Sequence, residues 1–538
     1  MFTSSESQKQ KNERILAAVV SSPHYVPPHR RLDSLRTLYK IGSGPSSSHT
    51  MGPKKAAQLF KVELEQLKCE KVKIEVTLYG SLAQTGSGHR TDYAILQVLG
   101  TENVELIWEM ERRLLFHTNG LLFKAIDKSN KQVILEKVYY SIGGGILEYG
   151  QPADTKTLYP TNKNLPTPAP MVYDQPALYA PCNNFHDHVE YCLKNHMMLD
   201  KMVYIFENRP ILKKLGVPEN LHESFFKADC PNKKGISENL IQTHLLSCWK
   251  TMKSCVEDGL NKTHLIETSQ ELEYPRTAAK LYQKALKLKP SARKDALLIQ
   301  SFALAVSEQN GSATHDVVTS PTCGACGVLP GILYFYYNKL NPALKEFKNG
   351  AWADQLMVSA LAVGGVIGNV CRANASISGA EAGCQAEVGV AEAMAAAAAT
   401  YIEMKAFRID GEKYSLREAL QNIEWAARNS LKNKLGLTCD PIKGLVIDPC
   451  IQRNGSSALT AHASAQVALA GVFDHLTSFD SVVKTMMDTG KDMLEEYRET
   501  GKGGLAINYT LDADAGRDLD YVKSEAYNQF GNDDIEDM

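Results

Sequence analysis

Three cysteines beside turn-forming residues are the side chains of this sequence best suited to hold a metal group. Cys384 follows a glycine, Cys439 precedes an Asp-Pro pair, and Cys450 follows another Asp-Pro pair. Because proline turns bend the chain, they can bring distant thiolates together. Three thiolates can hold an iron–sulfur cluster with one iron left open, and an open metal site can act as a Lewis acid. The alternative is that all three are free thiols packed as small hydrophobic side chains.

A second group of reactive side chains lies in the segment IGSGPSSSHT, residues 41–50. The hydroxyl of Ser47, Ser48 or Thr50 can cap the helix that we expect at 51–67. The same helix start offers free N–H groups to an anion such as a carboxylate, and the imidazole of His49 can move a proton beside it. Capping accounts for one hydroxyl of this segment, so both interpretations stay open at this point.

Polar residues also lie close to the cysteines in the sequence. Asn374, Ser376 and Ser378 form a loop directly before the first cysteine. They can be turn and N-cap residues, or they can donate hydrogen bonds to a substrate carboxylate or to cluster sulfides. Arg453, three residues after the last cysteine, can bind a carboxylate bidentately or brace a loop. Glu387 can serve as a base or hydrogen-bond acceptor near a cluster, or it can be an ordinary surface residue.

Two further residues have a familiar pattern and an ordinary alternative. Cys323 and Cys326 form a C-x-x-C pair, which on its own is a common metal or redox pattern. The glycines of SPTCGACG also suit a tight loop that only approaches the site.

His89 follows Gly-Ser-Gly, and we interpret it as a surface turn residue.

Alternating and periodic patterns predict the elements that must position these side chains. Residues 72–78 alternate between apolar and polar types and predict a strand, as do residues 133–140. Asn119-Gly120 lies between two apolar runs and predicts a hairpin. Strands mixed with helices predict an α/β domain over residues 35–150.

The remainder of the chain reads as helical. Residues 151–185 have the proline-rich composition of a linker, and residues 186–511 carry helix-period patterns with helices rich in small residues near the cysteines. We therefore predict an α+β protein, with the α/β domain followed by a larger all-α catalytic domain. Residues 1–34 are expected to be an N-terminal extension, 207–235 an insertion, and 512–538 a solvated acidic tail.

The composition is that of an ordinary globular protein. Hydrophobic residues make up 44% of the 538 residues, charged residues 22%, and the net charge is −2. This balance gives no reason to expect a nucleic acid or an anionic membrane as a partner. We find no apolar run that reaches the length of a membrane span and no signal-peptide core, so we expect a cytoplasmic protein with reduced thiols.

Several longer segments together identify a family. Those around the three cysteines read NASISGAEAGCQAE, LGLTCDP and PCIQRN. Others, in chain order, read GSGPSSSHTMGP, YGSLAQTGSGHRTD, SIGGG, SPTCGACGVLPG and TGKDMLEEYRETGKGGLA. In this order they resemble the iron–sulfur-dependent L-serine dehydratases of the single-chain type, also called L-serine deaminases. The resemblance runs from about Leu35 to about Asn508.

The resemblance implies an L-serine ammonia-lyase, which converts L-serine to pyruvate and ammonia in amino-acid catabolism that feeds gluconeogenesis. It implies a [4Fe-4S] cluster on Cys384, Cys439 and Cys450, whose open iron polarises the β-hydroxyl. It also implies a homodimer and an N-terminal domain related to a substrate-binding domain of phosphoglycerate dehydrogenase. We expect the site to lie between the domains. Its expected catalytic residues are His49, Ser48 and Thr50, and its expected substrate-binding residues are Ser46, Ser47, Asn374, Ser376, Ser378 and Arg453.

This sequence departs from the family pattern at two places. The position of Cys323 is commonly Asn in the family, so we do not assign Cys323 as a ligand. Some relatives end in a cysteine that reaches the open iron; no cysteine follows Cys450 here, and we expect no such autoinhibition.

Two other classes of function stay open from the residues. A pyridoxal-phosphate dehydratase would need a Schiff-base lysine and a phosphate site, and no lysine lies in a recognisable context. A non-enzymatic amino-acid sensor would suit the N-terminal domain but would leave the cysteines unexplained.

Overall fold

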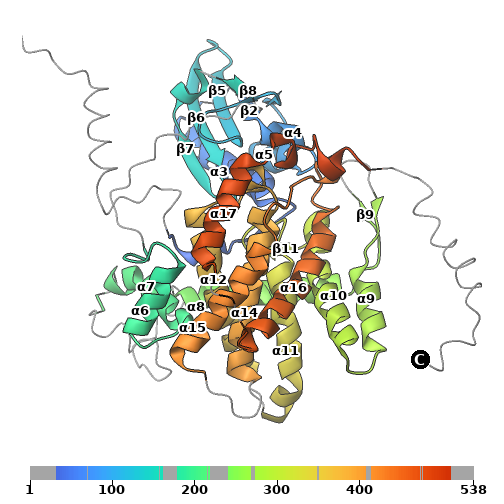
Figure 1. Cartoon of the computed structure of the whole chain (residues 1–538). Coiled ribbons are helices and arrows are strands. Elements are labelled where there is room, and N and C mark those ends of the chain that lie inside the picture. The colour runs from blue at the N-terminus through green and yellow to red at the C-terminus, as the bar shows by residue number, and fades with distance from the viewer. Residues whose placement is uncertain are drawn as a thin grey trace, which may run out of the picture.

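The computed structural model describes residues 32–509, except 70, 157, 161–177, 215, 218–239, 268–272, 348–349, 408–413, 473 and 475. The predicted acidic tail, nearly all of the N-terminal extension and much of the linker and of the insertion lie outside the described residues. A five-stranded sheet unit is seated at one end of a larger body of helices (Figure 1). The predicted α+β class is confirmed.

The sheet has the strand order β3-β2-β5-β6-β7. The strands are β2 (Val72–Tyr79), β3 (Val104–Glu109), β5 (Gly120–Asp127), β6 (Val133–Ser141) and β7 (Leu147–Gly150). β2 and β3 are parallel, and the other neighbours are antiparallel. The strands predicted at 72–78 and 133–140 are confirmed.

The hairpin predicted at Asn119-Gly120 is wrong. Gly120 begins β5, which pairs with β2 and β6, and the apolar run before it forms no strand. Leu114 from that run packs beneath Gly120 instead, where a Cβ would lie 2.8 Å from Leu114 Cδ1. The second apolar run is thus a central strand, and the first supplies part of its packing.

Helices α3 (Gly52–Gln66) and α5 (Thr91–Leu99) cover one face of the sheet. The Phe60 ring of α3 lies 5.2 Å from that of Phe123 in β5, within a buried apolar group. Short elements complete this unit: α4 (Ser81–Thr85), β4 (Arg112–Arg113), η3 (Pro152–Lys156) and β8 (Tyr159–Pro160).

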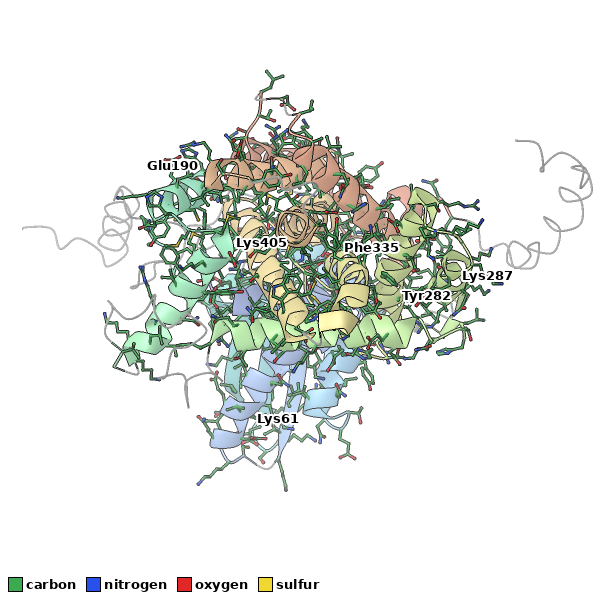
Figure 2. All side chains as sticks on the ribbon, turned by 90° about the horizontal axis from the view of Figure 1, so that it is seen from below. Lys61, Glu190, Tyr282, Lys287, Phe335 and Lys405 are labelled. Carbon is green, nitrogen blue, oxygen red and sulfur yellow. The ribbon has the colours of Figure 1, made fainter. Side chains whose placement is uncertain are left out.

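The other half is almost entirely helical. Its helices are α6 (Phe185–Lys194), α7 (Leu199–Lys214), α8 (Ile241–Gly259), α9 (Ala278–Leu286), α10 (Ala292–Ser312), α11 (Val328–Phe347), α12 (Gly350–Asn374), α13 (Gly379–Ala382), α14 (Val390–Ala406), α15 (Leu416–Lys432), α16 (Cys450–Leu469) and α17 (Phe479–Asp492). Its strands are β9 (Ile266–Glu267), β10 (Glu273–Tyr274) and β11 (Asp316–Val318), and single helical turns lie at η8 (Gln385–Gly389), η9 (Ile442–Gly444), η10 (Glu495–Tyr497) and η11 (Gly504–Ala506). Seen from below, α11 and α14 lie near the centre, with α6 (Glu190) on one side and α9 (Tyr282) on the other (Figure 2).

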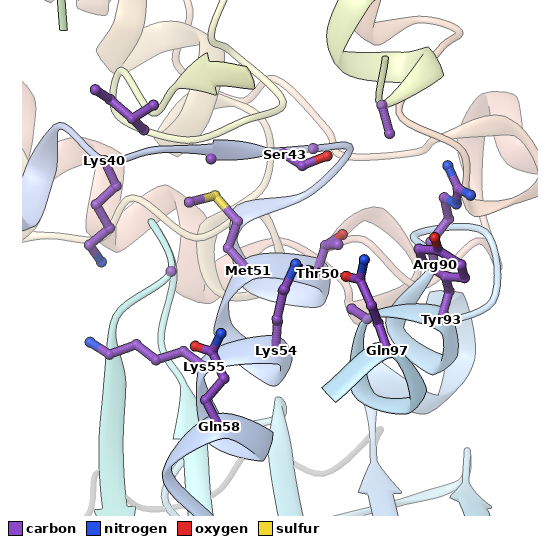
Figure 3. Close-up of a pocket in the computed structure, with 16 residues that line it drawn as sticks. Lys40, Ser43, Thr50, Met51, Lys54, Lys55, Gln58, Arg90, Tyr93 and Gln97 are labelled. Carbon is purple, nitrogen blue, oxygen red and sulfur yellow. Dashed lines mark hydrogen bonds between the residues drawn. The ribbon is translucent and has the colours of Figure 1, made fainter. Parts of the chain in front are cut away.

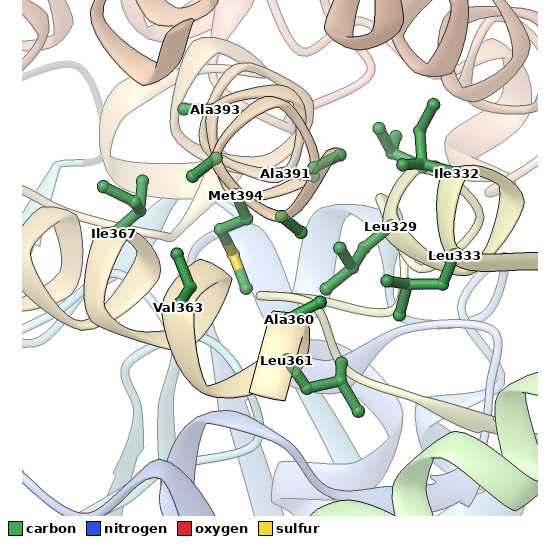
Figure 4. Close-up of a cluster of buried hydrophobic side chains, with 14 of the residues drawn as sticks. Leu329, Ile332, Leu333, Ala360, Leu361, Val363, Ile367, Ala391, Ala393 and Met394 are labelled. Atoms are coloured by element: carbon green, nitrogen blue, oxygen red, sulfur yellow. The ribbon is translucent and has the colours of Figure 1, made fainter. Parts of the chain in front are cut away.

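The helical core is built from small and branched apolar side chains of α11, α12 and α14 (Figure 4). Alanines and glycines let these helices approach closely: a Cβ on Gly364 would lie 2.9 Å from the Met394 carbonyl oxygen. One segment of α12, Ala351–Asn374, is long and apolar enough to cross a membrane, contrary to our expectation from the sequence. Because 94% of its apolar window is buried inside the protein, it packs as a core helix.

The described chain begins in the helical half before it enters the sheet unit. Leu35 and Leu38 of α2 (Leu35–Leu38) are buried in the helical core. β1 (Ile41–Ser43) then pairs with β11, in the register Ile41↔Val318. The π-helical turn η2 (Ser47–Met51) leads directly from β1 into α3. The Ser-Ser-Ser-His-Thr segment is therefore held between the two halves.

Candidate functional site

The three predicted cysteines come from three different elements. Cys384 precedes η8 and α14, Cys439 lies in an extended segment, and Cys450 is the first residue of α16. Burial raises the pKa of each thiol, and the pKa of Cys439 is raised further by the charges of Glu499, Cys384, Glu387 and Cys450. The structure thus brings the three thiols close enough to repel one another as thiolates. We call these three residues the cysteine site.

Arg453 supplies a positive charge beside the cysteine site. Its guanidinium holds down the pKa of Cys384 and Cys450, against the effect of burial. It also donates to the Thr438 carbonyl (2.7 Å) and to Asp440 (3.0 Å). Of the two roles open from the sequence, loop bracing matches these bonds.

A backbone pairing places a carboxylate next to the cysteine site. Cys439 N–H donates to the Tyr497 carbonyl, and Glu499 N–H donates to the Cys439 carbonyl, both at 2.8 Å. A Cβ on Gly379 would lie 3.1 Å from Cys439 Sγ and 3.4 Å from Glu499 Oε2. A side chain at this position would crowd these groups, so the glycine allows their close approach.

Glu387 and Glu499 form a pair of buried carboxylates. Burial raises the pKa of both, to about 7 for Glu387, and the charge of Glu387 raises that of Glu499 further. Since two buried carboxylates repel each other when both are ionised, at least one favours the protonated form. The Oε2 atom of Glu499 is buried and has no hydrogen-bond partner among the described residues. The pair can therefore hold and move a proton.

Three histidines of the sheet unit are buried, and two of them lie against Glu499; we call the three the histidine group. The rings of His49 and His89 stack with centroids 4.6 Å apart, and Glu499 Oε1 lies 3.7 Å from His49 Nδ1 and 3.6 Å from His89 Nε2. His117 is near enough to lower the pKa of His49, and its buried Nε2 has no partner among the described residues. Burial lowers the pKa of all three, to about 4 for His89 and about 3 for His117, so the rings are neutral near pH 7.

Residues 46–50 position His49 and His89. The Ser46 hydroxyl accepts from the His49 N–H (3.1 Å), and Ser48 Oγ lies 2.9 Å from His49 Nδ1. On the opposite side of the ring, Ser81 Oγ lies 3.1 Å from His49 Nε2. The Thr50 hydroxyl donates to the His89 carbonyl at 2.6 Å. Ser47 is buried in the same turn.

The loop before Cys384 places its three predicted residues differently. The Ser376 hydroxyl donates to Glu381 (2.7 Å) and accepts from the Ser378 N–H (3.0 Å). The Ser378 hydroxyl is buried without a partner among the described residues, and it packs against the 143–145 loop. Asn374 donates to the Asn183 carbonyl and belongs to the contact with the linker region. Ser378 is thus the member of this loop with a free buried donor.

The C-x-x-C segment is a tight loop held against the site by Asn454 of α16. The Asn454 side chain accepts from the Gly327 N–H (2.9 Å) and donates to the carbonyls of Gly324 and Cys450, both at 2.8 Å. A Cβ on Gly324 would lie 2.9 Å from Glu387 Oε2. Cys323 is buried and donates to the Met51 sulfur at 3.5 Å.

The donor chemistry fits an iron–sulfur cluster. The described residues contain no group of three His, Cys, Asp or Glu side chains arranged for a single metal ion. A cubane cluster is several atoms across and holds its thiolates farther apart than one ion does. Three converging thiols, a guanidinium that favours their ionised form, and neighbouring polar atoms without partners suit such a group.

Sequence reasoning missed three of these residues. His89 was interpreted as a surface turn residue, which is wrong: it is 1% exposed. His117 and Glu499 were not singled out at all. Glu499 lies within the TGKDMLEEYRETGKGGLA segment, so a site search restricted to matched segments would have found it, whereas nothing in the local sequence marks His117.

Comparisons with known proteins agree with this arrangement of two halves. The sequence profile of the serine dehydratase beta chain matches residues 34–106 and 97–151, and that of the serine dehydratase alpha chain matches residues 192–506. The L-serine dehydratase of Haemophilus influenzae is 32% identical over 88% of this chain and 98% of its own length. That of Streptomyces coelicolor is 33% identical over the same shares, and L-serine dehydratase 1 of Escherichia coli is 32% identical over 89% of this chain and 100% of its own length.

Proposed function

The chain belongs to the serine dehydratase family, and we propose that it is an L-serine ammonia-lyase that converts L-serine to pyruvate and ammonia. The observation that carries the proposal is the meeting of the cysteine site, the carboxylate pair and the histidine group between the two halves. Together they offer metal ligands, a proton acceptor and a proton donor in one buried place.

The proposed cofactor is a [4Fe-4S] cluster held by Cys384, Cys439 and Cys450. When bound, it would supply an open iron that acts as a Lewis acid on the β-hydroxyl of serine. Arg453 would help keep the ligands ionised, because its charge lowers the pKa of two of the thiols. Cys323 is not part of the proposed ligand set.

His49 is the proposed acceptor of the α-proton of serine. Its ring is neutral near pH 7 because burial lowers its pKa, and Ser48 and Ser81 fix its orientation. The electrons of the Cα–H bond form the Cα=Cβ bond as the Cβ–O bond breaks. The departing hydroxide takes a proton, for which the carboxylate pair is a source, and leaves as water. The resulting enamine hydrolyses to pyruvate and ammonia.

Substrate binding falls to groups that are buried beside these residues. The free hydroxyl of Ser378 can donate to the serine carboxylate. Ser46 and Ser47 lie in the turn that carries His49. The Thr50 hydroxyl keeps His89 in place by donating to the His89 carbonyl. The proposal also includes serine catabolism that feeds gluconeogenesis, a cytoplasmic location and a homodimer.

The test is pyruvate release from L-serine by anaerobically reconstituted protein, with iron measured on the same samples. We expect Cys384→Ala to lose both pyruvate release and iron. The matched control is Cys371→Ala, which removes a buried thiol of α12 and should keep both. Pyruvate release without iron, together with a pyridoxal absorbance lost on borohydride reduction, would overturn the proposal in favour of a pyridoxal enzyme.

A further inference from the structure

A cavity of about 630 Å³ lies between the sheet unit and β1, apart from the cysteine site (Figure 3). One wall is formed by α3 and α5, and the other by residues 40–44 at β1. None of the three cysteines, Glu387 or Glu499 lines it. Its volume is within the range of pockets that bind drug-sized organic molecules.

The charged side chains that line this cavity are all basic. They are Lys40, Lys54, Lys55 and Arg90, and no Asp or Glu side chain lines it. Among the described residues, none of the four has a carboxylate within ion-pair distance; Lys40 donates to the Gly144 carbonyl (2.8 Å) and Lys54 to Gln97 (2.7 Å). We call this the cationic cavity. Burial and the charge of Lys55 lower the pKa of Lys40 to about 7. The positive charges that face this space repel one another, and an anion placed there would reduce that repulsion.

The basic groups are spread along the cationic cavity. In Figure 3, Lys40 and Lys55 lie toward one end, Arg90 toward the other, and Lys54 between them. Arg90 lies over the exposed ring of Tyr93, 4.7 Å from its centroid. Basic groups at both ends and between them suit a ligand that carries more than one anionic group.

The cavity shares a wall with the turn that carries His49. Thr50 and Met51 line it. Outside the cavity, Thr50 donates to the His89 carbonyl and Met51 accepts from the Cys323 thiol. A molecule in the cavity would therefore touch both halves and the residues that hold His89 and the C-x-x-C loop.

We propose that the cationic cavity binds a small organic molecule with two or more phosphate groups, and that this binding regulates the enzyme by fixing the sheet unit against β1. The binding rests on the cavity alone, whereas the regulation rests on the proposed function. The two are measured separately below, so that failure of one is distinguishable from failure of the other.

Binding is tested by calorimetry on the full-length, anaerobically prepared protein with inorganic phosphate, pyrophosphate and ATP. We expect ATP and pyrophosphate to bind more tightly than phosphate, with affinity that falls as salt is added. Lys55→Glu should weaken pyrophosphate binding by about tenfold or more, since it replaces an attractive charge with a repulsive one. Lys61→Glu is the matched control, because it makes the same change on α3 outside the cavity and should have little effect (Figure 2).

Several results would overturn the proposal. Absence of binding by a folded wild-type protein would exclude the site, and equal weakening in the two variants would show general charge attraction. Equal affinity for phosphate and pyrophosphate would exclude a polyphosphate ligand. For regulation, saturating pyrophosphate should change the KM for L-serine in wild type and not in Lys55→Glu, with iron content unchanged. An unchanged KM despite measured binding would reject regulation and leave the binding site standing.

Discussion

The helical core and the boundary between the two halves are both buried, yet they are built from opposite kinds of side chain. The core between α11, α12 and α14 is apolar, with alanines and glycines at the closest approaches. The boundary, which we call the polar seam, holds the cysteine site, the carboxylate pair and the histidine group, with several polar atoms left without partners. Apolar burial stabilises a fold, whereas unpaired buried polar groups cost stability and are retained where chemistry needs them.

The sharpest contrast is expected between histidines in the two regions. His49→Asn should lower kcat by about 10²–10⁴-fold, because a positioned base contributes that much to proton transfer. Iron content should stay at the wild-type level, since His49 is not a proposed ligand. The control is His188→Asn: His188 is equally buried, but its Nδ1 bonds the Asn184 carbonyl in the helical half. Equal losses of kcat in both variants would show that His49 in the polar seam has no more effect on catalysis than a buried histidine of the helical half.

Substitutions in the helical core should lower the free energy of unfolding and leave kcat unchanged. Leu361→Ala removes a fully buried side chain of α12 and should lower the free energy of unfolding by about 2–5 kcal/mol. Denaturant unfolding measures this, and kcat per folded chain should be unchanged. Leu476→Ala, at a side chain 91% exposed, should change stability by less than about 0.5 kcal/mol. A loss of kcat at full folding in Leu361→Ala would contradict the comparison.

One carboxylate in the core should make stability depend on pH. Glu392 is buried 3.2 Å from the Lys434 ammonium, and burial raises its pKa from 4.5 to about 7. Between pH 4.5 and about 7 the folded protein therefore binds more protons than the unfolded chain. The contribution of Glu392 to the free energy of unfolding is most favourable below about pH 4.5 and is lost as pH rises through about 7.

Glu392→Gln should flatten this dependence and raise the melting temperature at pH 8, with an effect of up to about 3 kcal/mol. Melting curves across pH measure the change. Glu65→Gln, at an exposed position of α3, is the control and should keep the wild-type dependence. If Glu392→Gln also keeps it, the ionisation of Glu392 does not contribute.

The smallest expected effect is at Asn454, which holds the C-x-x-C loop to α16. Asn454→Ala leaves the Gly327 N–H and the Gly324 carbonyl without their partner and should cost about 1–3 kcal/mol of stability. Because the loop contacts Glu387, pyruvate release should also fall, by about tenfold. Asn429→Ala, which loses one bond to Ser464, should keep full activity. Unchanged activity in Asn454→Ala would show that the loop only packs there.

Regular patterns made the fold class and the strands predictable, because alternation and helix periodicity are local signals. The strand at 72–78 shows this. The hairpin at Asn119-Gly120 was mispredicted because the apolar run after it, β5, pairs with β2 and β6 and not with the run before it. The local sequence does not reveal these partners.

The candidate site was predictable only in part, for a similar reason. The segments around the three cysteines identify the family and thereby suggest a ligand set, and the structure brings those thiols together. Glu499 reaches the polar seam through a backbone pairing with Cys439, across a separation of sixty residues along the chain. His117 reaches it through the turn before β5. These contacts follow from tertiary packing. The segment that holds Glu499 resembles the family, whereas nothing in the local sequence marks His117.

The most direct test is the iron content of two variants, measured together with their pyruvate release. It separates the proposed ligand role of the cysteines from the proposed proton-acceptor role of His49. Cys450→Ala and His49→Asn would each be reconstituted anaerobically with the wild-type protein as reference. We predict roughly four irons per chain in wild type and in His49→Asn, little iron and no pyruvate release in Cys450→Ala, and pyruvate release lowered by about 10²–10⁴-fold in His49→Asn. Full iron in Cys450→Ala, or wild-type pyruvate release by His49→Asn, would contradict this prediction.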